Sequence, residues 1–358
     1  MFNLKKNLYY FILFTLFFYA CKSSEKKTFE NAIGNLGTLT VVSDKATHIA
    51  LKNTYNGIFL STQNNNALIE PFNQVLQPDI KEFNDFFYNQ RTVLVLVNKQ
   101  NYKALGNLLS PFKKDEIENY INSNTLTLKS ASNLMAKNQE FLYLFGNSSQ
   151  DLKNKLEINQ INIIRILLKN ELSAQIKALN NDSSKNIKFY TEMKTKYGVG
   201  VNIPSTFKLK RQADNFYLFQ MEDNSEPNLP KTFGIIVHTY PYKDTTDFNY
   251  INVRTVRDSI CKHSIPGEIA GTYMSTSESD FYPTRIKEMV NLNGYKASKI
   301  SAWWTVKGVS VSGPFLRYTI HIPGKNIIFA FEGFVNKANL NVKDKDIRLI
   351  EAIAQSIK

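Results

Sequence analysis

Hydrophobic positions in the first half of the chain predict strands and one long helix. The segment LGTLTVVSD at 36–44 alternates as a strand does, and RTVLVLVN at 91–98 is a continuous apolar run typical of a strand buried on both faces. NTLTLKSA and EFLYLFGN predict further strands, whereas NALIEPFNQVL and IKEFNDFFYN have helical or irregular spacing. Leucine and isoleucine recur at helical steps across 151–180, which predicts a long helix. The first half is therefore α/β-like.

From residue 199 the pattern changes to strands separated by turn residues. The expected strands are VGVNIP, FYLFQME, TFGIIVHTYPY, GTYMSTS, RIKEMVNLNG, YKASKISAWWTVKG, PFLRYTIHIP and NIIFAFEGFV. Helical spacing predicts one helix before them, which ends at Gly198, and two more at about 247–262 and 344–357. We therefore expect an α+β protein, in which an N-terminal α/β-like domain precedes a C-terminal antiparallel sheet with packed helices.

Changes in composition divide the chain into four parts. We assign 1–20 to a lipoprotein signal peptide and 21–35 to a flexible tether. An N-terminal α/β-like domain with the long helix then covers 36–185, and a C-terminal α+β domain covers 186–358. The polar run NNDSS at 180–184 precedes the boundary between these two domains.

The beginning of the chain has the pattern of an export signal. Lys5 and Lys6 precede an apolar run at 8–20 that is too short to span a bilayer as a helix. Ala20 stands directly before Cys21, and this arrangement resembles a bacterial lipobox. The resemblance implies that Cys21 is lipidated, for example with palmitate, and holds the protein on a membrane through a lipid anchor. An ordinary signal peptide and an uncleaved anchor are the alternatives.

The tether predicts which side of the membrane the protein faces. Lipoproteins that are exported to the surface of Bacteroidetes-type bacteria tend to carry acidic residues just after the lipidated cysteine. Here Ser23 and Ser24 intervene before Glu25, and Lys26 and Lys27 then reverse the charge. We therefore expect an outer-membrane lipoprotein of the cell envelope that faces the periplasm, with surface exposure as the alternative.

Charge and cysteine content narrow the choice of partners. The 358-residue chain has a formal net charge of +13, but the surplus is scattered lysine without an arginine-rich cluster, so we expect no nucleic-acid partner. Cys261 is the only cysteine besides Cys21. If Cys21 is lipidated, no intrachain disulfide can form, and we interpret Cys261 as a buried, inert thiol.

Motifs for catalysis, metals and cofactors are absent from the sequence. The four histidines, His48, His238, His263 and His321, are far apart and lack a second ligand at metal-binding spacing, so we interpret them as structural. GVSVSG at 308–313 misses the nucleophile motif GxSxG, because Ser312 stands where the second glycine should be. We therefore expect no enzyme activity, no metal site and no cofactor.

Aromatic residues are the best candidates for a binding site. The run AWW places Trp303 and Trp304 on opposite faces of a strand, and Tyr240 and Tyr242 share a face at a strand end. Exposed aromatic rings at such positions can stack on sugars or on partner side chains. The alternative is that helices cover both faces of the sheet and bury both tryptophans.

Several segments of the second half carry a resemblance to a known family. They are NIPSTFKL, DNFYLF, GIIVHTYPY, VRDSI, IPGE, GTYMST, GPFLRY and FEGFV. In this order and spacing they resemble the family of domain-of-unknown-function 4837, lipoproteins of Bacteroidetes-type bacteria, across 199–335. The resemblance implies lipidation at Cys21 and no established activity. The order of strands also looks like a PsbP/Mog1-type sandwich, which implies no function by itself.

These patterns together predict a non-catalytic binding or scaffolding protein of the bacterial envelope. Its partner would be an envelope protein or a glycan. An envelope enzyme of unrecognised type and a purely structural envelope component remain the alternatives.

Overall fold

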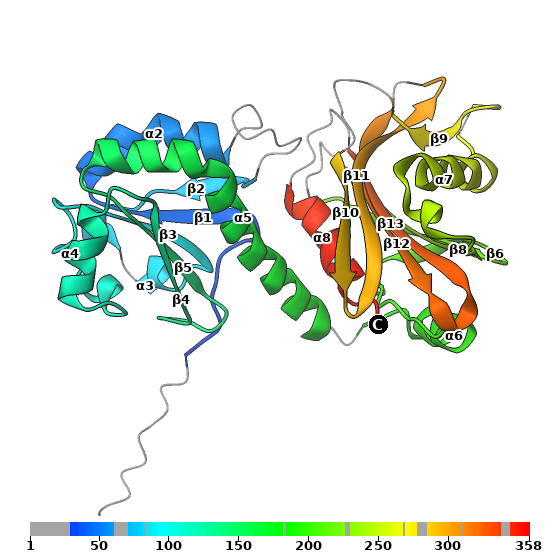
Figure 1. The fold of residues 1–358 in the computed structure, drawn as a ribbon, viewed down its shortest axis with the longest axis horizontal. Helices are drawn as coiled ribbons and strands as arrows, with labels where there is room; N and C mark the ends of the chain where they lie inside the picture. Colours follow the sequence, from blue (N-terminus) through cyan, green and yellow to red (C-terminus); the bar gives the residue numbers. More distant parts are fainter. Residues whose placement is uncertain are drawn as a thin grey trace, which may run out of the picture.

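The computed structural model describes residues 29–60, 71–83, 85–181, 184–225, 230–267, 269–277, 285–309, 311–337 and 344–358. Two separate sheets organise these residues, a five-stranded sheet in the first half and an eight-stranded sheet in the second (Figure 1). Both halves combine helices and strands, so the predicted α+β class is confirmed. The expected signal peptide and Cys21 lie outside the described residues.

The first sheet is mostly parallel. Its strands are β1 (Thr38–Val42), β2 (Gln74–Leu76), β3 (Thr92–Val97), β4 (Thr127–Ser132) and β5 (Glu140–Phe145), in the order β2-β1-β3-β5-β4. β1 pairs in parallel with β2 and β3, and β3 pairs in parallel with β5, whereas β4 is an antiparallel edge strand. Every residue of β3 is buried, as expected for a central strand that is covered on both faces.

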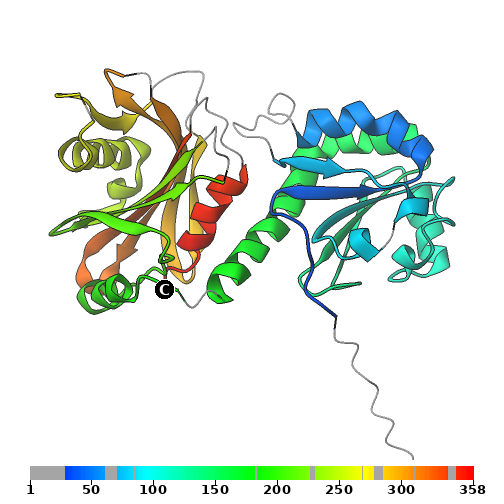
Figure 2. The same cartoon turned by 180° about the vertical axis from the view of Figure 1, so that it is seen from behind.

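Helices cover both faces of the first sheet. On one face lie α2 (Lys45–Phe59) and α5 (Ser149–Asn181), which run side by side in Figures 1 and 2. The short elements η1 (Ile80–Glu82), α3 (Asp85–Tyr88), η2 (Gly106–Leu109) and α4 (Lys114–Asn122) lie on the other face. α5 is kinked at Asn159, where the side-chain amide donates a hydrogen bond to the carbonyl of Lys155.

The second sheet is antiparallel throughout. Its strands are β6 (Lys208–Ala213), β7 (Phe216–Asp223), β8 (Lys231–Pro241), β9 (Tyr273–Thr276), β10 (Arg285–Leu292), β11 (Tyr295–Lys307), β12 (Ser312–Ile322) and β13 (Ile327–Lys337). Their order is β10-β11-β12-β13-β8-β7-β6, and β9 pairs with β11 beyond this path. Neighbours in sequence are mostly neighbours in the sheet, except that β13 inserts beside β8.

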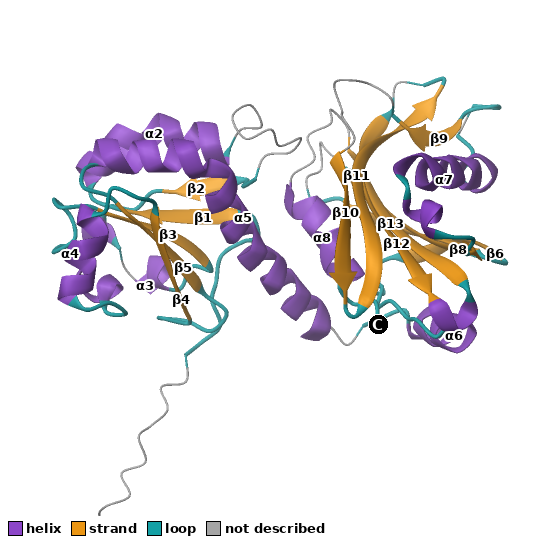
Figure 3. Ribbon diagram, viewed as in Figure 1, coloured by secondary structure: helices purple, strands orange, loops and turns teal. Residues whose placement is uncertain are grey.

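Helices also cover both faces of the second sheet, which curls between them (Figure 3). α6 (Ile187–Tyr197) and α8 (Asp344–Ala354) pack on one face, and α7 (Tyr250–Ser264) packs on the other, where it also contacts β9. Two short turns, η3 (Thr245–Phe248) and η4 (Pro323–Lys325), follow β8 and β12. Side chains therefore alternate between an α8-facing core and an α7-facing core along each central strand.

The expected strand VGVNIP is wrong. Its apolar residues Val199, Val201 and Ile203 are buried in the α8-facing core, but only Pro204 forms an isolated bridge, with Lys185. The backbone of Gly200 instead exchanges hydrogen bonds with Lys358 at the end of the chain. Alternation thus identified the buried residues of this segment correctly, although none of the strands that the structure describes forms a ladder with it.

The long helix α5 links the two halves. Its first part packs on the first sheet, and its later part contacts α8 (Figure 1). The side-chain amide of Gln175 on α5 donates to the carbonyl of Lys345 on α8 at 3.1 Å. α8 therefore contacts both the second sheet and the helix that belongs to the first.

Candidate functional site

The two candidate tryptophans lie inside the second sheet. Trp303 is 3 % exposed and Trp304 is 2 % exposed. Trp304 faces α7, and its indole Nε1 donates to the carbonyl of Val335 at 3.2 Å. Helices cover both faces of the sheet, so the exposure that a stacking role requires is missing at both tryptophans.

The two candidate tyrosines have different surroundings. Tyr240, at the end of β8, stacks on His238 with 5.6 Å between the ring centroids. Tyr242, just beyond the strand, stacks on His321 with 3.8 Å between the centroids and 24° between the planes. Tyr242 therefore stands at the surface and lines a hollow at the end of the second sheet.

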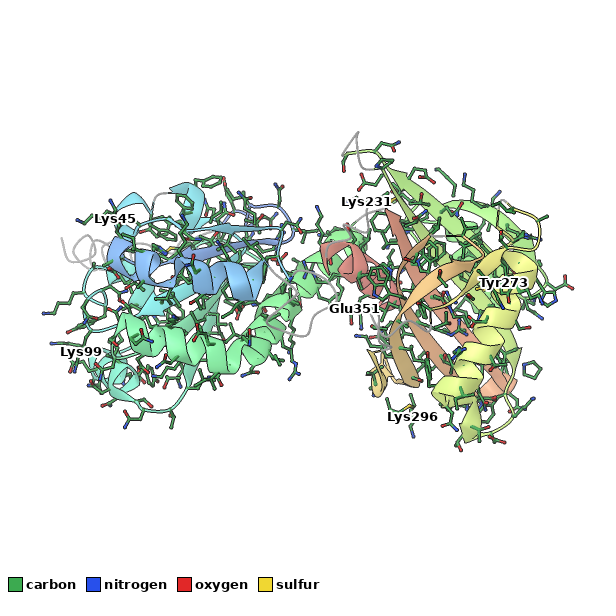
Figure 4. All side chains as sticks on the ribbon, turned by 90° about the horizontal axis from the view of Figure 1, so that it is seen from above. Lys45, Lys99, Lys231, Tyr273, Lys296 and Glu351 are labelled. Atoms are coloured by element: carbon green, nitrogen blue, oxygen red, sulfur yellow. The ribbon has the colours of Figure 1, made fainter. Side chains whose placement is uncertain are left out.

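A hollow of about 650 Å³ opens at the end of the second sheet where β8 and β12 finish. We call it the hairpin groove; it is lined by Tyr242, Thr245, Phe248, Asn249, Met289, Gly294, Tyr295, Lys296, His321 and Pro323. These residues come from η3, from the β10–β11 hairpin and from the ends of β8 and β12. Figure 4 shows Lys296 at the opposite end of the sheet from Lys231.

Local sequence explains why the groove has its shape. Asn293 and Gly294 both have positive φ angles, as the tight turn of a two-residue hairpin requires, and they join β10 to β11. The amide of Asn293 donates to the carbonyls of Gln355 and Ile357, which ties the hairpin to the end of the chain. On the other wall, the Asp244 side chain caps the start of η3.

The lining of the groove suits recognition by stacking and hydrogen bonding. The half-buried rings of Tyr242 and Phe248 form its apolar surface. Tyr295 lies at the rim, and its side chain packs against the α8-facing core. Lys296 and His321 add polar nitrogen atoms, and the lining contains no carboxylate and no thiol. No group of histidine, cysteine and acidic side chains in the described parts of the chain could hold a metal ion.

A buried charge network lies behind the groove, between α7 and the sheet. Arg257 on α7 donates from Nε to both carboxylate oxygens of Glu332 on β13, at 3.0 Å each. Arg317 on β12 donates from Nη1 to Glu332 Oε2 at 3.2 Å and from Nη2 to His238 Nε2 at 2.8 Å. All four side chains are at most 2 % exposed. Asp258 also accepts from Arg257, at 3.0 Å, so two cations face two carboxylates.

The network shifts the protonation of its members. Burial alone would lower the pKa of Arg257, but the Glu332 carboxylate more than offsets this and the pKa is raised. Burial, reinforced by Arg317 and Arg257, lowers the pKa of His238 well below its usual value. His238 is therefore neutral in the folded protein. Burial likewise raises the pKa of Cys261 to about 12, as expected of the predicted inert thiol.

Polar residues continue from this network towards the groove. We call Ser298, Thr319, Arg317, His321 and His238 the polar stripe; all five face α7, and Ser298, Thr319 and His238 share one row across the sheet. The atoms Ser298 Oγ, Thr319 Oγ1, Arg317 Nε, His321 Nε2 and His238 Nδ1 are buried and have no hydrogen-bond partner among the described residues. Each such atom costs about 1–3 kcal/mol if nothing else satisfies it.

Stability should fall when the pH is lowered through the range in which free histidine titrates. The folded pKa of His238 is depressed, so below about pH 6.5 the unfolded state binds the extra proton. We expect this histidine to contribute a loss of about 1.4 kcal/mol in the free energy of unfolding at pH 5.5 relative to neutral pH. His238→Gln keeps an acceptor for Arg317 but cannot titrate.

Urea denaturation at pH 7.5 and pH 5.5 measures the effect. The variant should lose less stability than the wild type between the two values, while the lowered pKa of His48 leaves a residual slope in both proteins. An unchanged pH dependence in the variant would contradict the assignment of His238 as a buried neutral base.

Trp304 also lies at the edge of a second hollow, of about 400 Å³, at the other end of the α7-facing core. Its walls are mainly apolar and include Met274, Val306 and Phe334. The polar side chains in its lining, such as Glu222, come from β7, β8 and β13. The hairpin groove, with its aromatic and polar lining, is the better candidate for specific recognition.

Sequence reasoning identified only part of this site. The aromatic pattern predicts Tyr242, whereas the spacing of the histidines indicates a structural role for His321, and no local pattern points to Lys296. The predicted lipidation site, Cys21, lies outside the described residues. Within the part of the chain that the structure describes, no helix has both the length and the apolar character needed to cross a membrane.

Comparison with solved structures finds distant likenesses. The Ran-binding protein Mog1p of Saccharomyces cerevisiae matches with 11 % identity and a TM-score of 0.31, over 46 % of this chain and 92 % of Mog1p. LpqN of Mycobacterium tuberculosis, involved in cell envelope biogenesis, matches with 14 % identity and a TM-score of 0.26, over 45 % of this chain and 82 % of LpqN. Neither likeness is close enough to bear on function.

Among the sequence comparisons, the match that is found covers the second half of the chain. A search of curated proteins finds no match. A family model does match, over residues 186–356, and its description is domain of unknown function DUF4837. The resemblance expected from the motifs of the second half is thus confirmed, and this segment, with its hairpin groove and buried charge network, is similar to the DUF4837 family.

Proposed function

We propose that the protein is a lipid-anchored, non-catalytic binding protein of the bacterial cell envelope, and that it binds a glycan in the hairpin groove. The observation that carries the binding role is the lining of this groove. Tyr242 and Phe248 offer flat apolar faces of the kind that stack on sugar rings. Lys296 and His321 stand beside them with nitrogen atoms that can meet sugar hydroxyls.

The same lining supports a non-catalytic role. Glycoside hydrolysis uses a pair of carboxyl groups on either side of the scissile bond, and the groove lining has none. The polar atoms that do line it come from amide, hydroxyl, imidazole and ammonium groups, which suit hydrogen bonding. The lining of the groove therefore favours binding over catalysis.

The anchoring part of the proposal rests on the sequence. The apolar run at 8–20, followed by Ala20 and Cys21, supports attachment through a lipidated cysteine. Two or more acyl chains on one residue hold a protein stably on a bilayer, whereas one chain does so only marginally. The lysines at 26 and 27 support a position on the outer membrane that faces the periplasm.

Replacing the anchoring cysteine should release the protein. We expect Cys21→Ser to abolish lipid attachment, because a hydroxyl is not the thiolate nucleophile that takes the diacylglyceryl group. Metabolic labelling with a fatty-acid analogue, followed by membrane fractionation, measures the effect. Cys261→Ala is the matched control, since Cys261 is 1 % exposed and should not affect labelling. Lipid label on the Cys21 variant would refute the anchoring proposal.

A glycan array tests the binding role. The full chain, purified in detergent, is applied to an array that contains neutral and acidic bacterial and plant oligosaccharides. We expect binding to a related group of sugars, and we expect Tyr242→Ala to reduce the signal for that group. An array without any bound member would refute the glycan proposal and leave a protein partner as the remaining choice for the groove.

A further inference from the structure

Cationic side chains concentrate in one stretch of the second half. Residues 185–214, which include α6 and β6, contain seven lysine and arginine residues and two acidic residues, a net charge of +5. The whole chain of 358 residues carries +13, so this short stretch holds more than a third of the surplus. Such a concentration is typical of a surface that meets an anionic partner. Its exposed cations are Lys188, Lys194, Lys196, Lys208, Lys210 and Arg211.

The helix and the strand that carry these cations are held together at both ends. The amide of Asn186, just before α6, donates to the carbonyls of Pro204 and Phe207 at 2.8 and 3.0 Å, which places the start of α6 beside the start of β6. Lys196, near the end of α6, donates to the carbonyl of Asp214, just beyond β6, at 2.8 Å. α6 and β6 therefore form one surface, which we call the basic corner.

The protein itself does not neutralise this surface. Among the described residues, none of its cations forms an ion pair with a carboxylate side chain. Lys208, for example, donates to the neutral carbonyl of Ser205 at 2.8 Å. The acidic residues of the stretch are Asp214 and Glu192, and Glu192 accepts from the hydroxyl of Tyr217. The excess positive charge is therefore available to a partner.

Two exposed apolar side chains lie among the cations. Ile187 is the first residue of α6 and is 59 % exposed, and Leu209 on β6 is 46 % exposed. Every residue of β6 is exposed, and none of the described strands pairs with its outer edge. Lysines interspersed with aliphatic side chains are typical of surfaces that lie at the headgroup level of a bilayer. The combination favours a lipid surface over an acidic protein.

The basic corner lies on the side of the molecule where the described chain begins. That chain begins at Phe29, and its blue start and α6 both lie at the lower side of the ribbon in Figures 1 and 2. Cys21 precedes Phe29 by eight residues, which can span at most about 29 Å. A lipid on Cys21 would therefore keep this side of the protein within reach of the bilayer.

We propose that the basic corner docks on an anionic lipid surface, that of the bilayer in which the protein is anchored, and so fixes the orientation of the protein. This inference rests on the proposed lipid anchor and adds a second contact with the membrane. The cations lie against lipid phosphates, and Ile187 and Leu209 enter between the headgroups. One cation near an anionic surface strengthens binding about fivefold, so several together stabilise the docked state.

Hydrogen exchange of the anchored protein tests the inference. The full chain is reconstituted in vesicles of phosphatidylcholine and in vesicles that also contain about one-third phosphatidylglycerol, and exchange is followed by mass spectrometry at about 0.15 M salt. We expect peptides from α6 and β6 to exchange at least about fivefold more slowly on the anionic vesicles, and about 1 M salt to remove the difference. Peptides from β4, an edge strand of the first sheet, should exchange equally on both.

A pair of double variants locates the contact. Lys208→Glu with Lys210→Glu should remove the difference between the vesicles, because it reverses two charges of the basic corner. Lys45→Glu with Lys99→Glu is the matched control, since both lysines are exposed and lie in the first half (Figure 4). It should keep the wild-type difference. Both variants should unfold at the wild-type temperature, because all four side chains are exposed.

Equal exchange of the wild type on the two kinds of vesicle would overturn the docking and leave an acidic protein as the partner that this surface fits. Slow exchange that persists in the Lys208 and Lys210 variant would overturn the assignment to the basic corner. Flotation of the vesicles reports on the anchor separately. Binding to anionic vesicles alone would refute the anchor but support the docking, and binding to neither kind would refute both.

Discussion

Glu332→Gln should lower the free energy of unfolding by about 3–5 kcal/mol, the range for breaking a buried ion pair by removing one partner. The Glu332 carboxylate is fully buried and accepts from Arg257 and Arg317 at 3.0 to 3.2 Å. An amide cannot neutralise either guanidinium, and neither arginine can lose its proton to escape the cost of burial. Chemical denaturation followed by circular dichroism measures the change.

Glu157→Gln provides the control for this prediction. Glu157 pairs with Lys153 at 3.9 Å on the exposed side of α5, and about half of its side chain is accessible. Surface pairs of this kind contribute about 0–1 kcal/mol, so this variant should remain close to the wild type. If both variants lost the same small amount, the buried charge network would not stabilise the second half as we describe.

Gly313→Ala should destabilise the protein by about 3 kcal/mol, the upper range for inserting a methyl group into a packed core. A Cβ at Gly313 would lie 2.1 Å from the backbone carbonyl oxygen of Val335 and 3.0 Å from Trp304 Nε1. These two atoms form the hydrogen bond that holds the indole, so the methyl group would disrupt it. We expect a lower midpoint of thermal unfolding and altered tryptophan fluorescence.

Gly324→Ala is the comparison for this effect. Gly324 belongs to the η4 turn, and a Cβ there would have nothing within 4 Å. Its stability should match the wild type within about 0.5 kcal/mol, as is usual for surface substitutions. A stable Gly313→Ala protein with unchanged fluorescence would show that β12 and β13 can separate locally without loss of packing.

Much of the fold could be predicted because hydrophobic periodicity records burial directly. The apolar run at 91–98 predicts the strand that the structure shows as β3, and the apolar repeat at 151–180 predicts the helix α5. The helix α2 is not predicted by the hydrophobic pattern. Its buried face includes Thr47, His48 and Thr54, so the apolar periodicity of the segment is weak. The short strand β2 is not predicted for another reason. It is a strand because it pairs with β1, which is distant in sequence, and no local pattern records this pairing.

The candidate site was harder to predict because its residues meet only in the folded sheet. The hairpin groove combines η3, the β10–β11 hairpin and the end of β12, and no local pattern records that proximity. One signal was present: in PFLRYTIHIP, Arg317, Thr319 and His321 alternate with apolar residues in an otherwise buried strand. A polar residue at every second position of such a strand indicates a polar stripe on one face.

The motifs that carried the family resemblance also meet in space. VRDSI supplies Arg257, GPFLRY supplies Arg317, FEGFV supplies Glu332 and GIIVHTYPY supplies His238. Four segments that are separate in sequence therefore contribute one member each to the buried charge network. Sequence spacing alone could not reveal this, because the strand order places β13 beside β8 rather than at the edge of the sheet.

Calorimetric titration of the groove with the strongest ligand from the glycan array tests the central claim most directly. The proteins are the full-length wild type, Tyr242→Ala and Tyr102→Ala, the last a half-buried tyrosine of the first half that serves as the control. Glycan binding in the hairpin groove predicts about tenfold weaker affinity for Tyr242→Ala, the contribution of one aromatic stacking contact, and wild-type affinity for Tyr102→Ala. Equal affinities for all three proteins would contradict the assignment of the hairpin groove as the binding site.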